Sequence, residues 1–109
     1  MDRSLADRLN DLWKQSDVLK SAEEAFLRLE AERKPLFSML FLKAEGKSVA
    51  DREAVAYNSS DWADFVAGHV AAETAFNYER RKFEILEKAY LAEHATYKID
   101  DRSIRKAGA

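Results

Sequence analysis

His69 and Glu73 are the residues in this sequence whose types and spacing come nearest to a chemical site. They lie one helical turn apart, and that spacing can bring an imidazole and a carboxylate to one metal ion or one proton path. Two ligands do not complete a site. Ferritin-like di-metal bundles use a Glu three residues before the His, whereas Val66 precedes His69 and Leu91 precedes His94. We therefore interpret His69 as part of a half-buried helical seam, and predict no metal and no cofactor.

The other common catalytic groups are missing from the sequence. The chain has no cysteine, which excludes thiol nucleophiles and thiolate zinc sites. No Gly-x-Ser-x-Gly elbow is present, and the three glycines, Gly46, Gly68 and Gly108, are too far apart for a phosphate-binding loop. We predict that the protein is not an enzyme. A metal-dependent bundle enzyme using His69 and Glu73 stays as the alternative.

Basic residues near the C-terminus are the best candidates for contacting an anionic partner. Residues 78–109 hold eight Lys or Arg and six Asp or Glu, whereas residues 1–77 hold ten and fourteen. A local positive excess attracts phosphates even when the whole chain carries −2. Acidic residues lie among the basic ones, so a salt-bridged solvent face is the competing interpretation. The candidates for binding nucleic acid or a partner are Arg80, Arg81, Lys82, Lys88, Arg102, Arg105 and Lys106.

The elements that would position these residues are all predicted to be helices. Only three Gly and one Pro occur among 109 residues, and no alternation typical of strands is visible. An apolar residue recurs every seventh position from Leu5 to Leu40, except at Arg33, which predicts a helix over about 5–44. Pro35 interrupts it, but the stripe keeps its phase, so we favour one kinked helix over two. Gly46 would then end the helix in the left-handed conformation.

Two further helices follow in the sequence. Ser48 resembles a helix cap and predicts a short helix over 48–57. The polar run 58–61 predicts a turn and a cap for a long helix over about 61–97. Residues 98–109 lose the apolar period, so we expect a frayed basic tail. The predicted fold is a single all-α domain, a long antiparallel helical hairpin with a short linking helix, assembling as an oligomeric bundle.

The third helix has apolar residues on two sides. The second line, at Ala71, Ala75, Tyr78, Ile85, Ala89 and Ala92, cannot be covered by the same neighbour as the first. One partner would be the first helix, and the other is most economically a second copy, with a dimer favoured. We assign the first line to the oligomer seam rather than to base stacking. It consists of Trp62, His69, Phe76, Phe83, Tyr90 and Tyr97.

Membrane insertion and export are not predicted. No apolar run reaches the roughly 18 residues that a membrane-spanning helix needs, and the first four residues include Asp2 and Arg3. We expect a cytoplasmic protein.

About half of the chain, roughly residues 40–95, resembles a group of small helical bacteriophage accessory proteins from recombination and replication gene neighbourhoods. The resemblance lies in the segment 46–54, Gly-Lys-Ser-Val-Ala-Asp-Arg-Glu-Ala, in Trp62, and in Ala72-Glu73, Tyr78, Arg81 and Phe83-Glu84-Ile85-Leu86-Glu87. Pro35 and the aromatic N-terminal stripe depart from that pattern.

The resemblance implies two long helices joined by residues 46–54, with no catalytic residues. It also implies a role in supporting DNA recombination or replication in the cytoplasm of the bacterial host. The implied partners are the protein itself, a recombination or single-strand-binding protein, and DNA. The alternative is a phage-encoded inhibitor or adaptor that docks on a host protein without nucleic acid.

Overall fold

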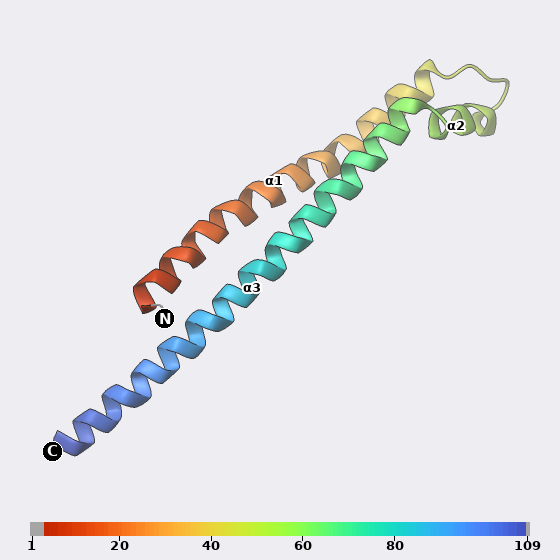
Figure 1. The fold of residues 1–109 in the computed structure, drawn as a ribbon. Coiled ribbons are helices and arrows are strands. Elements are labelled where there is room, and N and C mark those ends of the chain that lie inside the picture. Colours follow the sequence, from red (N-terminus) through yellow and green to blue (C-terminus); the bar gives the residue numbers. More distant parts are fainter. Residues whose placement is uncertain (1–3, 109) are drawn as a thin grey trace. The chain divides into compact units, whose positions relative to one another are not determined.

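The computed structural model describes the backbone of residues 4–108 and the side chains of residues 4–96 and 98. This part of the chain forms three helices and no strand: α1 (Leu5–Lys43), α2 (Val49–Tyr57) and α3 (Ser60–Gly108). Figure 1 shows α2 between the end of α1 and the start of α3. The all-α prediction, with one long helix packed against another, is confirmed.

Each helix begins at a serine cap. The hydroxyl oxygen of the cap accepts a hydrogen bond from the backbone amide three residues later, which satisfies one of the free donors at a helix start. The three caps are Ser4, Ser48 and Ser59, which accept from the amides of Asp7, Asp51 and Trp62 at 3.0, 3.1 and 3.1 Å. Ser59 also donates to the carbonyl of Ala56 at 2.7 Å, which ties the end of α2 to the start of α3.

The prediction of one helix across Pro35 is confirmed, because α1 runs through this residue without a break. The end of the third helix differs from the predicted one. α3 continues to Gly108, beyond the predicted end near Tyr97 and across the segment expected to fray. The reason is that residues 98–107 contain no Gly or Pro, and half of them are the good helix formers Lys, Arg and Ala, so the loss of apolar period does not stop the backbone.

Gly46 is needed for space, not for a left-handed turn. No described glycine has a positive φ, so the predicted left-handed ending of α1 is wrong. A Cβ at Gly46 would instead lie 2.9 Å from Cβ of Asp51 and 3.2 Å from the backbone nitrogen of Arg52. The loop therefore passes too close to the first turn of α2 for any side chain to fit at this position.

The chain divides into two compact units, which we call the hairpin unit (residues 21–77) and the terminal unit (residues 1–20 and 78–109). In the hairpin unit, the second half of α1 packs against α2 and the start of α3 (Figure 1). Its buried apolar residues are Leu40, Ala44, Ala56 and Phe65. Phe37 contacts the rings of Tyr57 and Trp62, with centroids 4.6 and 5.4 Å apart. Aromatic side chains therefore hold α2 on the hairpin.

Farther along the hairpin unit, Phe26 stacks on Phe76 at 5.7 Å and contacts His69 at 5.4 Å. These contacts place this part of the aromatic line between α1 and α3 of one chain, and its assignment to a seam between copies stays a prediction. Trp62, His69 and Phe76 all face α1 of their own chain, because the seven-residue spacing of α3 meets the matching stripe of α1.

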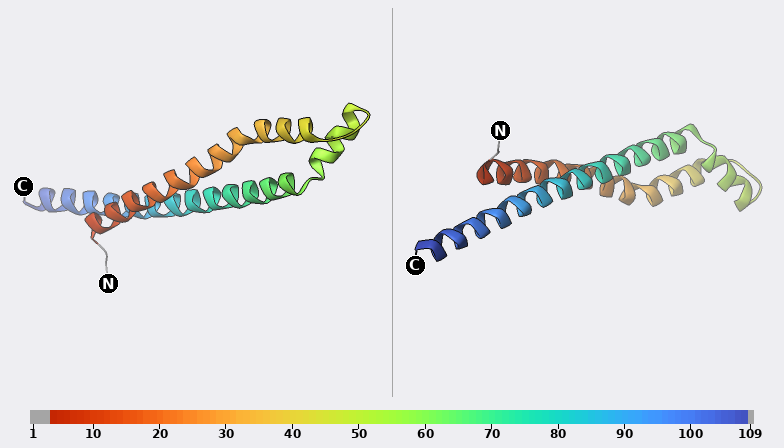
Figure 2. Two further views of the ribbon diagram at one scale, coloured as in Figure 1. Left: turned by 90° about the horizontal axis from the view of Figure 1, so that it is seen from above. Right: turned by 60° about the horizontal axis from the view of Figure 1, so that its bottom comes forward.

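In the terminal unit, the first half of α1 contacts α3 through Arg8, which meets Glu93, and Gln15, which meets Glu79. Figure 2 shows the course of both helices from two further sides. Phe83 lines an open hollow together with Leu9, Leu12 and Trp13 of α1, so this member of the aromatic line also faces its own chain. Tyr90 is half-buried and stacks on His94 of α3 at 5.9 Å. The side chain of Tyr97 lies outside the described residues.

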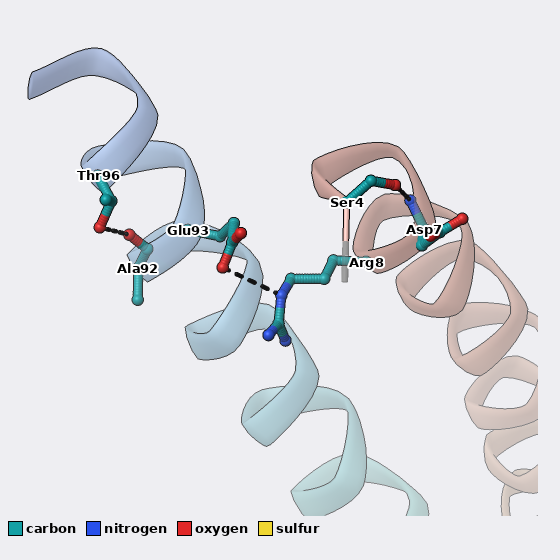
Figure 3. Close-up of polar contacts among 6 residues, drawn as sticks. All are labelled: Ser4, Asp7, Arg8, Ala92, Glu93 and Thr96. Atoms are coloured by element: carbon teal, nitrogen blue, oxygen red, sulfur yellow. Dashed lines mark hydrogen bonds and ion pairs between the residues drawn. The ribbon is translucent and has the colours of Figure 1, made fainter. Parts of the chain in front are cut away.

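Polar pairs occupy core positions of the terminal unit. Gln15 is only 4% exposed, and its Nε2 donates to the backbone carbonyl of Glu79 at 3.1 Å and to the carboxylate Oε2 of the same residue at 2.5 Å. Two heptads further along α3, the carboxylate of Glu93 lies 3.3 Å from Nε of Arg8 (Figure 3). In both pairs a polar residue of α1 meets a polar residue of α3, which favours this register over its neighbours.

Candidate functional surface

His69 is held by a partner that the sequence did not indicate. It is 7% exposed, and its Nε2 donates a hydrogen bond to Oε1 of Glu30 on α1. Its ring also contacts Phe65 at 6.0 Å. Glu73, the predicted neighbour at helical spacing, is exposed. Among the described side chains, no cluster of three or more His, Asp or Glu is arranged to hold a metal ion.

Four of the seven predicted binding residues have described side chains, and all four are exposed on α3 of the terminal unit. They are Arg80, Arg81, Lys82 and Lys88. Because a helix turns about 100° per residue, the three consecutive ones point in different directions, while Arg81 and Lys88 share one side. The structure therefore does not gather the basic run into one cluster. The side chains of Arg102, Arg105 and Lys106 lie outside the described residues.

A mixed stripe of basic and apolar side chains runs along α3 where Arg81 and Lys88 lie. Tyr78 and Ile85 are 56% and 67% exposed, and each lies three residues before one of these basic residues. Positions three and four apart are neighbours on a helix surface. We call Tyr78, Arg81, Ile85 and Lys88 the outer stripe of α3, because they lie away from the residues that contact α1.

Lys82 lies on a different side of α3, next to α1. It lines an open hollow of the terminal unit together with Lys14 and Asp11, and with the polar and apolar side chains Gln15, Val18 and Leu86. Lys14 is far from Lys82 in the sequence, and no motif marks it. The side chains of Lys14 and Lys82 line the same hollow only because α1 and α3 pack antiparallel.

Large apolar side chains are widely exposed in the described part of the chain. No large side chain is fully buried, while Trp13, Ile85 and Leu42 are 67%, 67% and 77% exposed. Apolar side chains that are exposed singly are common on monomeric proteins, whereas a large contiguous apolar patch marks an interaction surface. Five residues of the second apolar line are exposed and Ala89 is half-buried; the exposed ones are Ala71, Ala75, Tyr78, Ile85 and Ala92.

The residues that sequence reasoning missed are the polar ones that pair across helices. Glu30, Gln15 and Arg8 meet His69, Glu79 and Glu93. The sequence did contain a signal for two of the pairs. Arg8 and Gln15 each lie three residues after an apolar heptad position of α1, on the side that packs against α3. Glu79 and Glu93 lie three residues after the heptad positions of α3 in the same way. Glu30 carries no such mark.

Comparison with known proteins found no matching family model, no matching curated protein and no matching solved structure. Within the described residues, no helix has a stretch that is both long enough and apolar enough to span a bilayer.

Proposed function

We propose that the protein is a non-enzymatic, self-associating accessory protein that supports DNA recombination or replication by binding DNA with the exposed face of α3. The observation that carries the proposal is the outer stripe, in which basic side chains alternate with an aromatic and an aliphatic one. Arg and Lys contact phosphates of any sequence, and an exposed Tyr offers a ring on which a base can stack.

Charge distribution along the chain supports the same choice of surface. The terminal unit contains twelve Lys or Arg and ten Asp or Glu, whereas the hairpin unit contains six and ten. An anionic ligand is therefore attracted to the terminal unit and repelled by the hairpin unit. The attraction is small for one chain, so several copies bound side by side on one strand would supply most of the affinity.

The setting of this function follows from the resemblance of residues 46–54 and of the segment 72–87 to phage accessory proteins. We place the protein in the cytoplasm of an infected bacterium, beside a recombination or single-strand-binding protein. Most side chains of the three helices are exposed to solvent, and exposed helix surfaces suit a role in binding partners.

Fluorescence anisotropy with labelled single-stranded and double-stranded oligonucleotides tests the proposal. We expect binding that weakens steeply between about 50 and 200 mM salt, because phosphate contacts release counterions. Arg81→Glu/Lys88→Glu, which reverses both basic residues of the outer stripe, should abolish most of it. Arg33→Glu/Lys34→Glu is the matched control, since it makes the same change in net charge at exposed residues of the hairpin unit. Absence of binding at low salt would instead favour a role through protein partners alone.

A further inference from the structure

Three helical segments of the hairpin unit meet around an open hollow of about 540 Å³. Four of the residues that line it come from one side of α1, one from the end of α2 and one from the first turn of α3. A hollow of this size is within the range of pockets that bind ligands. The lining residues are Arg33, Lys34, Phe37, Ser38, Tyr57 and Trp62.

The lining of the hollow carries two positive charges and no negative one. Arg33 and Lys34 are exposed, and within the described part of the chain neither side chain forms an ion pair or a hydrogen bond. Arg33 is also the basic exception in the apolar stripe of α1, so it lies on the side of α1 that packs against α3. An anionic group in the hollow would therefore meet two cations from one helical turn.

The apolar part of the hollow consists of aromatic rings. Trp62 meets Phe37 at an interplanar angle of 71° and Tyr57 at 77°. Tyr57 is 55% exposed, and the other two rings are half-buried. Trp62 also stacks on Phe65 at 5.3 Å, so one face of its ring is already covered. Rings at these angles suit a bulky apolar side chain, whereas successive bases stack on flat ring faces that are open.

We propose that this hollow docks a short acidic segment of a partner protein, with carboxylates on Arg33 and Lys34 and a neighbouring bulky apolar side chain against the aromatic rings. Arg and Lys form charge-assisted hydrogen bonds with carboxylates. An apolar anchor that fills a pocket supplies much of the binding energy in protein interfaces. The inference rests on the accessory role in the proposed function and names the chemistry of the partner.

A peptide suits this hollow better than a nucleic acid does. The hairpin unit contains six Lys or Arg and ten Asp or Glu, so it repels a long polyanion. A short segment brings only a few carboxylates, and charges more than about 8 Å from them are largely screened at physiological salt. The contacts with the two lining cations then outweigh the charge of the whole unit. DNA would bind the outer stripe, and the partner protein would bind the hollow.

Selection from a displayed library of short random peptides tests the chemistry of the ligand. We expect the peptides that the protein enriches to combine Asp or Glu with Phe, Trp, Tyr or Leu. The same selection on the Arg33→Glu/Lys34→Glu protein should not enrich them.

Fluorescence anisotropy with the most enriched peptide, labelled with fluorescein, then measures the affinity. Arg33→Glu/Lys34→Glu should weaken binding by about tenfold or more, because two attractive contacts become repulsive. Arg81→Glu/Lys88→Glu is the matched control, since it makes the same change in net charge at exposed residues of the terminal unit. The control should bind the peptide like the unchanged protein.

Cysteine footprinting tests the place of binding without changing the charge, because the natural chain contains no cysteine. Ser38→Cys puts a thiol at an exposed position in the lining of the hollow. The same peptide at about ten times its Kd should slow alkylation of this thiol by iodoacetamide roughly tenfold, in proportion to the unoccupied fraction. Ser21→Cys is the matched control, because Ser21 is an exposed residue of the hairpin unit that does not line the hollow. Its alkylation rate should not change.

The inference is overturned if the selection enriches no peptides or enriches basic ones, or if the peptide leaves the alkylation rate of Ser38→Cys unchanged. It also fails if Arg33→Glu/Lys34→Glu lowers the affinity for oligonucleotides as much as Arg81→Glu/Lys88→Glu does, because the hollow would then bind nucleic acid. If acidic peptides bind the hollow as expected but oligonucleotides do not bind the protein, the docking site stands and the DNA-binding function fails.

Discussion

Replacing Gln15 by leucine should destabilise the protein, although leucine is the residue that a helical core usually prefers at this position. Gln15 is almost fully buried and its amide donates twice to Glu79, once to the carbonyl and once to the carboxylate. A hydrogen bond between neutral groups contributes about 0.5–1.5 kcal/mol, and one to a charged group about 1.5–3 kcal/mol. Leucine recovers roughly 1 kcal/mol through its apolar surface. The free energy of unfolding should therefore fall by about 1–3.5 kcal/mol.

The double variant Gln15→Leu/Glu79→Leu separates the hydrogen bonds from the packing. Removing both partners leaves no carboxylate facing a leucine, so the double variant should be about as stable as the unchanged protein or more stable. Glu79→Leu alone should have a smaller effect than Gln15→Leu, because the amide of Gln15 keeps the backbone carbonyl as an acceptor. The double-mutant cycle should give a coupling energy at least as large as the stability lost by Gln15→Leu alone, because the double variant recovers the losses of both single variants.

Urea unfolding followed by circular dichroism measures the four proteins, at two protein concentrations so that self-association is accounted for. Lys14→Leu is the control, because Lys14 is the exposed neighbour of Gln15 and its replacement should change stability by no more than about 0.5 kcal/mol. A Gln15→Leu protein as stable as the unchanged one would refute the reasoning. It would mean that the hydrogen bonds between Gln15 and Glu79 contribute nothing to the free energy of unfolding beyond the packing of the side chain.

Three further substitutions have expected outcomes that the same unfolding assay measures. Pro35→Ala should stabilise the protein by about 1–3 kcal/mol, because proline inside a helix removes one backbone hydrogen bond; a loss of stability would show that the proline shapes α1. Gly46→Ala should destabilise it by about 1 kcal/mol or more, since the new Cβ would meet that of Asp51 at 2.9 Å. Ser59→Ala should remove about 1 kcal/mol, because the amide of Trp62 loses its acceptor.

Local features of the fold could be predicted because they depend on neighbouring residues. Scarce Gly and Pro predict helices, and the seven-residue stripe of α1 predicts which side of it is covered. The caps at Ser48 and Ser59 are likewise local, since a serine and an amide three residues later suffice. The end of α3 was predicted too early, because an apolar period reports what a helix packs against and not where its backbone stops.

Contacts between distant residues depend on how α1 meets α3, which no local pattern specifies. The sequence alone determined three helices, the heptad line on α3 and the positive excess near the C-terminus. The tertiary structure decided that the line faces α1 and that Glu30 meets His69. The physical reason is that helical periodicity sets the side on which a residue lies, whereas the register between two helices follows from the sum of contacts along both. That sum also leaves Tyr78 and Ile85 exposed.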